Sequence, residues 1–142
     1  EALDLKGNEQ VLEVGTGSGY QAVLLSQLVR RVVTVERIPE LTEQSMALIA
    51  SLGCSNVKVE QASDILGCAR YAPYGGIVVS GSLPAIPNAL VDQLSHGGRM
   101  ILPVGSREEQ DLKTILKQEN GLKIGSLGPC RFVPIIGLGA WH

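Results

Sequence analysis

Short apolar segments alternate along the chain with segments whose apolar residues recur every three or four positions. Runs rich in Val, Leu and Ile predict five buried strands, at 10–15, 31–36, 57–61, 76–81 and 99–105. Helical spacing predicts helices between them, at 20–29, from Pro39 to a stop at Gly53, and at 87–94 before His96-Gly97-Gly98, whereas 62–71 has no clear pattern. The leucine, isoleucine and valine residues expected on the buried faces of the first two helices are Leu24, Leu25, Leu28, Val29, Leu41, Leu48, Ile49 and Leu52.

The last third of the chain has a different pattern. Apolar and polar residues alternate at 112–118 and 122–127, on either side of Asn120-Gly121, which predicts a β-hairpin. Strands that alternate with helices and then give way to a hairpin are typical of one α/β domain. We therefore expect a single domain over 1–142, with a doubly wound, mostly parallel sheet, helices on both faces and a C-terminal antiparallel edge hairpin, a Rossmann-like arrangement.

Composition narrows the class of protein. The 142 residues are 44% hydrophobic and 18% charged, with a net charge of −2, as in a folded globular protein. The basic pair Arg30-Arg31 is the largest basic cluster, which disfavours nucleic acid, and no apolar run is long enough to cross a membrane. The N-terminal sequence does not resemble a signal peptide. We expect a cytoplasmic protein whose three cysteines are reduced and buried, with no metal-ligand spacing: Cys54, Cys68 and Cys130, beside only His96 and His142.

Candidate chemistry is concentrated at the ends of the first two strands. Gly15-Thr16-Gly17-Ser18-Gly19 follows the first strand, where glycines let a ligand approach the backbone and a helix N-terminus, although a simple turn would look the same. Glu13 lies inside an apolar strand and needs a cation or a donor, which a backbone N–H could also supply. Glu36 ends the second strand, where a carboxylate accepts hydrogen bonds from ribose hydroxyls or is simply solvated. Together these features favour an adenosine-type cofactor.

The spacing of the glycines discriminates between cofactors. The dinucleotide motif Gly-x-Gly-x-x-Gly would need a glycine where this chain has Tyr20. S-adenosylmethionine has no pyrophosphate, and its ammonium and sulfonium groups suit an acidic neighbour such as Glu13. The sequence therefore favours a methyl donor, and a nicotinamide dehydrogenase ranks last.

Four segments, at 11–38, 72–94, 97–105 and 131–135, resemble the protein-L-isoaspartate O-methyltransferases. The resemblance covers nearly the whole chain and implies a seven-stranded methyltransferase fold. It also implies S-adenosylmethionine-dependent methylation of isoaspartyl carboxylates in damaged proteins, a repair activity. The residues then expected to bind the cofactor are Glu13, Gly15, Thr16, Gly17, Ser18, Gly19, Glu36, Arg37, Ser63, Asp64 and Ser80.

The chain also departs from the family pattern. An Asp-Gly pair near the adenine aligns here with Ser63-Asp64, Gly75 stands where the family has Asp, and Ser80-Gly81-Ser82 replaces Thr-Ala-Ala. Family members carry an N-terminal segment that closes over the substrate, and we expect this chain to begin after it. Two alternatives therefore stay open: a non-catalytic cofactor-binding domain, and a methyltransferase for a different acceptor.

Methyl transfer to a carboxylate needs no general base, because the nucleophile is already ionised at neutral pH. We therefore assign no catalytic residue. The expected substrate contacts are Ser80, Leu83 and the segment from Arg131 to Val133, with Arg131 either meeting a peptide carboxylate or forming a surface ion pair. Ser80 and Ser82 could instead cap the helix that follows, and Tyr20 and Gln21 could equally be packing residues. We expect His96, beside Gly97-Gly98, to be a turn residue.

Overall fold

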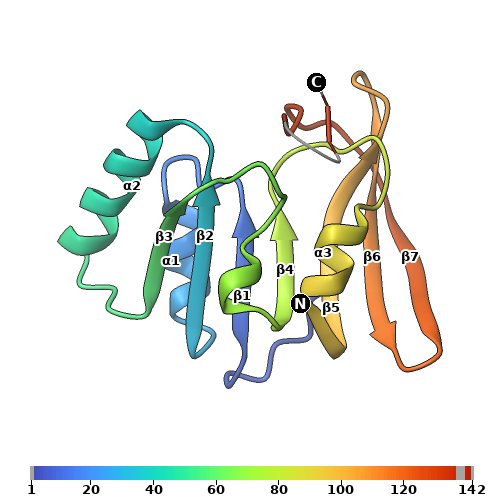
Figure 1. The fold of residues 1–142 in the computed structure, drawn as a ribbon, viewed down its shortest axis with the longest axis horizontal. Coiled ribbons are helices and arrows are strands. Elements are labelled where there is room, and N and C mark those ends of the chain that lie inside the picture. Colours follow the sequence, from blue (N-terminus) through green and yellow to red (C-terminus); the bar gives the residue numbers. More distant parts are fainter. Residues whose placement is uncertain (1, 137–139, 142) are drawn as a thin grey trace.

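The computed structural model describes residues 2–136, 140 and 141, which form one seven-stranded sheet (Figure 1). The strand order is β3-β2-β1-β4-β5-β6-β7, with parallel pairing from β3 to β5 and antiparallel pairing of β6 and β7 at the edge. The doubly wound sheet with an antiparallel hairpin is thus confirmed. The strands are β1 (Gln10–Val14), β2 (Arg31–Glu36), β3 (Val57–Gln61), β4 (Tyr74–Val79), β5 (Leu94–Gly105), β6 (Gln110–Gln118) and β7 (Gly121–Cys130).

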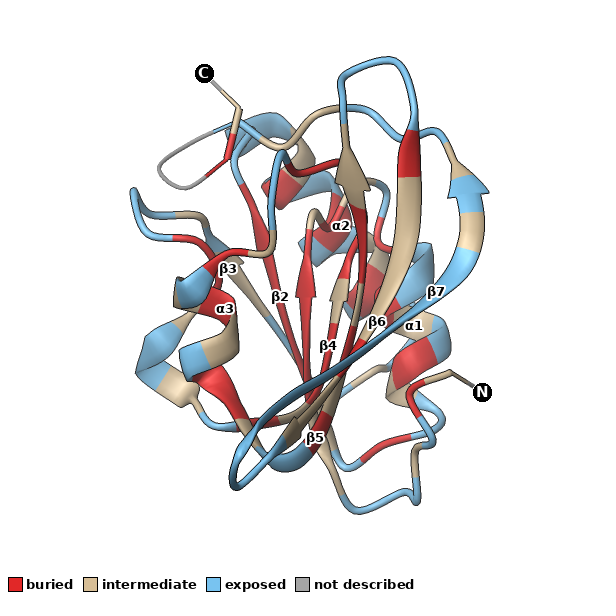
Figure 2. Cartoon of the chain, turned by 90° about the vertical axis from the view of Figure 1, so that its right-hand side faces the viewer, coloured by how far each residue is buried: buried red, intermediate tan, exposed pale blue. Residues whose placement is uncertain are grey.

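Helices cover both faces of the sheet, with α1 (Tyr20–Ser26) and α3 (Asn88–Gln93) on opposite sides (Figures 1 and 2). Successive side chains of a strand point to opposite faces, and the core divides accordingly. Val11 and Val32 pack with residues of α1 and of α2 (Pro39–Ser51), whereas Leu12 and Val33 belong to the core cluster that includes Leu90 of α3. A short 3₁₀ turn at Ala69–Tyr71 precedes β4.

Helix α1 is shorter than predicted and buries fewer leucines. It ends at Ser26 rather than at 29, and Leu24 and Leu28 are 64% and 59% exposed. The sheet contacts one stripe of a helix, and residues spaced by three and four, Ala22, Leu25 and Val29, already occupy it. Leu24 and Leu28 therefore form a second stripe that faces outward. In α2, Leu52 is likewise exposed, because it follows the end of the helix.

The boundaries around α3 also differ from the prediction. Strand β4 starts two residues earlier, at Tyr74, and β5 begins at Leu94, directly after the helix. The Ser95 hydroxyl donates a hydrogen bond to the Tyr74 carbonyl at 2.9 Å, and Leu94 pairs with Tyr74 across a local register shift. The interpretation of His96 as a turn residue is therefore wrong, since it lies within β5.

The edge hairpin is longer than predicted and turns one residue earlier. Gln118 pairs with Gly121, so the connecting residues are Glu119 and Asn120 rather than Asn120-Gly121. The three cysteines are free thiols that are half-buried rather than buried. The described part of the chain contains no helix long and apolar enough to cross a membrane and no cluster of three metal-ligating side chains.

Candidate functional site

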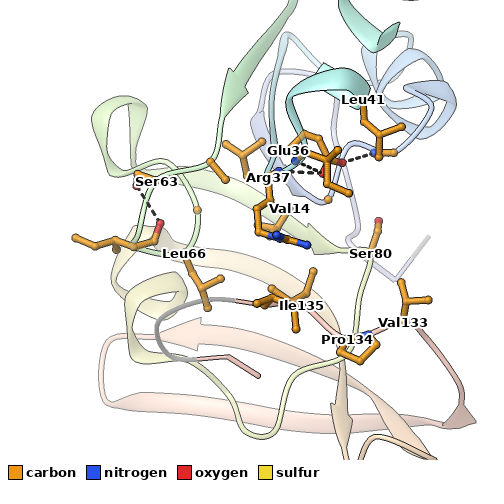
Figure 3. A pocket seen from close by; sticks show the side chains of 18 of the residues that line it. Val14, Glu36, Arg37, Leu41, Ser63, Leu66, Ser80, Val133, Pro134 and Ile135 are labelled. Carbon is orange, nitrogen blue, oxygen red and sulfur yellow. Dashed lines mark hydrogen bonds between the residues drawn. The ribbon is translucent and has the colours of Figure 1, made fainter. Parts of the chain in front are cut away.

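A cavity of about 270 Å³ opens at the carboxyl ends of β1, β2 and β4, where the order of the parallel strands reverses (Figure 3). Ligands of open α/β sheets bind at this position because loops leave the sheet there in opposite directions. The lining combines a glycine loop, a carboxylate and an apolar wall. It consists of Val14, Gly15, Gly17, Val35, Glu36, Arg37, Ile38, Leu41, Ala62, Ser63, Asp64, Ile65, Leu66, Gly67, Ser80, Val133, Pro134, Ile135 and Ile136.

The glycine loop is held against the end of β2 by backbone hydrogen bonds. The amides of Gly15 and Thr16 both donate to the Val35 carbonyl, at 2.9 and 3.2 Å. Gly15 and Gly17 have φ of 96° and 56°, in the left-handed region that favours glycine. A side chain at Gly17 would meet no atom within 4 Å, so its surroundings are open to a ligand.

The Glu36 carboxylate lies between the glycine loop and the start of α2. Its Oε1 accepts the amide N–H of Gly17 at 2.9 Å, and its Oε2 accepts those of Arg37 and Ile38 at 2.9 and 3.1 Å. A carboxylate can accept about four hydrogen bonds, so acceptor capacity remains beside the cavity. Glu36 thus fixes the loop and also offers an acceptor to a ligand.

The apolar wall of the cavity comes from two segments. Ile38 and Leu41 stand at the start of α2, and Ala62, Ile65 and Leu66 follow β3. Sequence reasoning placed no ligand contact on these residues. They follow the ends of β2 and β3, and the carboxyl ends of parallel strands meet at one edge of the sheet. Their positions in the sequence could therefore have indicated that they lie near the site.

Gln93 of α3 makes two hydrogen bonds to the segment that carries Leu66 of this wall. Its Nε2 donates to the Leu66 carbonyl, and its Oε1 accepts the Cys68 amide, both at 2.9 Å. Gly67, with φ of 80°, fits between them, since a side chain there would collide with Gln93. Gln93 is buried, and no pattern in the sequence distinguished it from a packing residue.

We expect Gln93→Leu to lower the free energy of unfolding by about 2–3 kcal/mol, because the Leu66 carbonyl and the Cys68 amide both lose their hydrogen-bond partner. Urea denaturation measures the change. The matched control is Gln44→Leu on the exposed face of α2, for which we expect little change. Equal stability of the Gln93 and Gln44 variants would contradict this role.

Two of the predicted cofactor ligands lie beneath the loop instead of in the cavity. Glu13 is 0% exposed, and its Oε1 accepts the Thr34 hydroxyl at 2.6 Å, while the Thr16 and Thr34 hydroxyls are 2.6 Å apart. Glu13 Oε2 has no hydrogen-bond partner among the described residues. Burial raises the pKa of Glu13 to about 7, with the Thr34 bond acting against the rise and the charge of Glu36 adding to it. The prediction that Glu13 and Thr16 contact a ligand directly is therefore corrected.

Ser18 and Gly19 also lie outside the cavity lining. Ser18 is exposed, and Gly19 faces α2, where an added Cβ would come within 3.2 Å of the Ser45 Cβ. Gly19 therefore allows the start of α1 to pack closely against α2, a structural role that the glycine spacing alone did not reveal.

Eight predicted residues from five segments do line the cavity. Figure 3 shows Arg37 extending over it from the end of β2. At its rim, the Ser80 hydroxyl donates to Gln21 Oε1 at 2.7 Å, so Gln21 supports this rim, whereas Tyr20 is exposed. The predicted residues that the structure brings together at the cavity, in addition to Val133, are Gly15, Gly17, Glu36, Arg37, Ser63, Asp64 and Ser80.

The segment after β7 runs beside the loop that follows β4. The Ser82 amide donates to the Val133 carbonyl at 2.7 Å, and the Ile135 amide donates to the Ser82 carbonyl at 2.9 Å. The two segments that were predicted to contact the substrate therefore lie side by side. Leu83, however, is buried in the core, and Arg131 is exposed and lies outside the lining, so the structure does not support either as a cavity contact.

We expect Ser82→Ala to raise the free energy of unfolding by about 1 kcal/mol. The Ser82 hydroxyl is buried without a hydrogen-bond partner among the described residues, and alanine removes that desolvated group while keeping both backbone bonds. Thermal denaturation tests the change against Ser55→Ala at an exposed serine. A destabilised Ser82 variant would show that its hydroxyl has a partner.

The sheet order, the glycine loop after β1 and the carboxylate at the end of β2 define a Rossmann-like methyltransferase fold. The sequence profile of the protein-L-isoaspartate(D-aspartate) O-methyltransferases matches residues 1–139. The chain belongs to this family.

Individual relatives agree with this assignment. Protein-L-isoaspartate O-methyltransferases of Syntrophotalea carbinolica and Methanoculleus marisnigri are 45% and 43% identical to it, over 100% of this chain and 66% and 64% of their own length. A solved protein-L-isoaspartate O-methyltransferase superposes with a TM-score of 0.89 at 28% identity, covering 97% of this chain and 45% of that one. The chain spans just under two thirds of the curated relatives it matches.

A structure from Plasmodium falciparum, described as a protein-L-isoaspartate O-methyltransferase in complex with S-adenosyl-L-homocysteine, is also similar. Its TM-score is 0.68 at 26% identity, and the match covers 88% of this chain and 64% of that one.

Proposed function

We propose that the cavity binds S-adenosylmethionine and that the protein transfers its methyl group to the carboxylate of L-isoaspartyl residues. The observation that carries the proposal is Glu36, whose carboxylate orders the Gly17 amide and still borders the cavity. A carboxylate at the end of the second strand suits the hydroxyls of a ribose. The family of the chain and the S-adenosylhomocysteine complex of its Plasmodium neighbour support the same ligand.

The chemistry of the lining fits this cofactor better than a dinucleotide. Ile38, Leu41 and Leu66 offer an apolar surface to a flat base next to Glu36. The lining contains two carboxylates, Glu36 and Asp64, and one cationic side chain, Arg37, so its net negative charge repels a pyrophosphate and attracts a cation. We propose that cofactor contacts come from Gly15, Gly17, Glu36, Arg37, Ser63, Asp64 and Ser80.

The proposed reaction requires the protein to align the two reactants and does not require it to transfer a proton. When bound, S-adenosylmethionine supplies an electrophilic methyl group, and the isoaspartyl carboxylate is already ionised at neutral pH. Ser80 and Val133 border the cavity where the segments after β4 and β7 meet, so we propose that they orient the acceptor. Rate enhancement then comes from holding the two reactants in line and from excluding water.

The deciding experiment is a methyl-transfer assay with two peptides that differ only in one isoaspartyl or aspartyl linkage. We expect the isoaspartyl peptide to be methylated and the aspartyl peptide not, with S-adenosylhomocysteine inhibiting. Equal methylation of both peptides would point to a different acceptor. Methylation of neither would contradict the proposed activity.

One observation favours a second candidate, binding of the cofactor without turnover. Val133, at the acceptor side of the cavity, is 74% exposed, so the described residues leave that side open to water. Tight binding of S-adenosylhomocysteine by a chain that methylates neither peptide would favour this candidate.

We further propose that residues 1–142 form one domain of a cytoplasmic protein that acts on isoaspartyl-containing proteins and binds no nucleic acid. The continuous seven-stranded sheet supports the single domain. The three free thiols are typical of a reducing compartment, and the net charge of −2 disfavours a polyanionic partner.

A further inference from the structure

A chain of hydrogen bonds runs beneath the glycine loop and ends at a buried carboxyl group. Glu13 and Thr34 stand opposite each other on the adjacent strands β1 and β2 (Figure 1), and Thr16 belongs to the loop itself. Each of the two links, Thr16 to Thr34 and Thr34 to Glu13, measures 2.6 Å. All three side chains are buried.

The protonation state of Glu13 decides which groups donate in this series of hydrogen bonds. A hydroxyl has one hydrogen to donate, so when Thr34 donates to ionised Glu13, Thr16 must donate to Thr34. A proton on Glu13 Oε1 reverses the bond to Thr34, and Thr34 is then free to donate to Thr16; a proton on Oε2 leaves both bonds as they are. Thr16 also anchors the loop, since its carbonyl accepts the Gly19 amide at 3.1 Å. A proton on Oε1 of Glu13 is thus transmitted to a residue that shapes the loop.

No positive charge faces Glu13 in the described part of the chain. Strand β2 contributes Thr34 and the like charge of Glu36, and β4 places Val78 opposite. On the helices that cover this face, the titratable side chains all point to solvent: Tyr20 of α1, and Glu40 and Glu43 of α2. Oε2 of Glu13 has no hydrogen-bond partner among these residues, and burial raises the pKa of the group to about 7.

A cation bound at the loop would lie close to this carboxyl group. Glu13 and Gly15, which lines the cavity, are two positions apart in the chain, so their Cα atoms are at most about 7 Å apart. At such a range inside a protein, a unit charge changes the ratio of ionised to protonated carboxyl roughly tenfold.

We propose that Glu13 couples ligand binding to proton release: a cationic ligand at the glycine loop drives the Glu13 carboxylic acid to the carboxylate, the proton leaves to solvent, and Thr34 relays the change to Thr16. The proposal rests on the proposed function, because the ammonium and sulfonium groups of S-adenosylmethionine provide the charge. Glu13 is then a positioning residue that acts through the loop, without touching the ligand. It makes the affinity for a cationic ligand fall as the pH drops below neutrality.

Isothermal titration calorimetry tests the coupling. The 142-residue chain is titrated at pH 7 with S-adenosylmethionine or S-adenosylhomocysteine, in buffers of different ionisation enthalpy, and the slope gives the protons released. The ligand's amino group also titrates, so the decisive quantity is the difference between the wild type and Glu13→Gln. We expect about half a proton more from the wild type at pH 7 and no difference at pH 9. The difference should be larger for S-adenosylmethionine, whose sulfonium is charged.

Thr34→Val provides a second variant and a separate readout. The Thr34 hydroxyl holds the pKa of Glu13 down, so its loss should move the midpoint of the pH dependence of binding to higher pH. Thr114→Val, which removes a hydroxyl from β6, should leave that midpoint in place.

The possible failures are distinguishable. Binding with equal proton release from the wild type and Glu13→Gln, or an unmoved midpoint in Thr34→Val, would overturn the coupling and leave the proposed function intact. Absence of binding by both ligands to the wild type would contradict the proposed function, and with it the cationic ligand of this proposal.

Discussion

Glu36→Gln should raise the Kd for S-adenosylhomocysteine about a hundredfold. The carboxylate accepts three backbone N–H groups and has acceptor capacity left at the cavity. A glutamine keeps the shape but replaces one acceptor oxygen by an NH₂ group, which cannot accept an N–H and repels it. Loss of one charge-assisted hydrogen bond of about 1.5–3 kcal/mol, the one proposed to a ribose hydroxyl, gives an effect of up to this size.

Calorimetric titration with S-adenosylhomocysteine measures the Kd, and urea denaturation reports separately on the fold. Glu43→Gln is the matched control, because it makes the same change of charge on an exposed position of α2. A 2′-deoxyribose analogue sharpens the test: the wild type should discriminate against it, and the Glu36 variant should not. Unchanged affinity in a folded Glu36 variant would remove Glu36 from the proposed cofactor site.

The strands β2 and β3 could be predicted from the sequence without error in their bounds. The bounds of β2 and β3 match the prediction, because β2 is a short apolar run and β3 a short segment with valines at alternate positions. The outer face of α1 could not be predicted, since Leu24 and Leu28 satisfy helical spacing as well as Leu25 and Val29 do. Which stripe is buried depends on how the helix lies on the sheet.

The predicted residues line the cavity where chain position alone decides, and lie outside it where the pleat of the strand decides. Gly15, Gly17 and Glu36 follow strand ends and therefore reach the cavity. Glu13 lies inside β1, where alternate residues face opposite sides: it shares the face of Val11, whereas Val14 lines the cavity.

Hydrogen bonds between a helix and a distant loop could not be predicted from the sequence. Gln93 fastens the wall formed by Leu66 and Cys68 from a helix that is 25 residues away from Cys68 along the chain. The apolar wall was missed for a related reason. Ile38, Leu41 and Ile65 are residue types that usually pack inside a core. Only the three-dimensional structure shows that they border a cavity.

Glu13 should also make the stability of the ligand-free protein depend on pH. Its pKa is about 7 in the folded protein, well above the ordinary value of 4.5, so the folded state holds more protons than the unfolded chain between these pH values. Stability therefore falls as the pH rises from about 4.5 to 7 and stays low above. The shift corresponds to about 3–4 kcal/mol, because each pKa unit amounts to roughly 1.4 kcal/mol.

Glu13→Gln keeps an acceptor for the Thr34 hydroxyl but cannot ionise, so its stability relative to the wild type should rise from about 1 kcal/mol at pH 5 to about 3 kcal/mol at pH 8. Urea denaturation of both proteins at pH 5, 6.5 and 8 measures the difference. Asp4, whose pKa is lowered by a hydrogen bond from Lys6, titrates with the opposite sign in both proteins and cancels. A constant difference across this pH range would show that Glu13 is ionised throughout it, and that a positive charge compensates it in the folded protein.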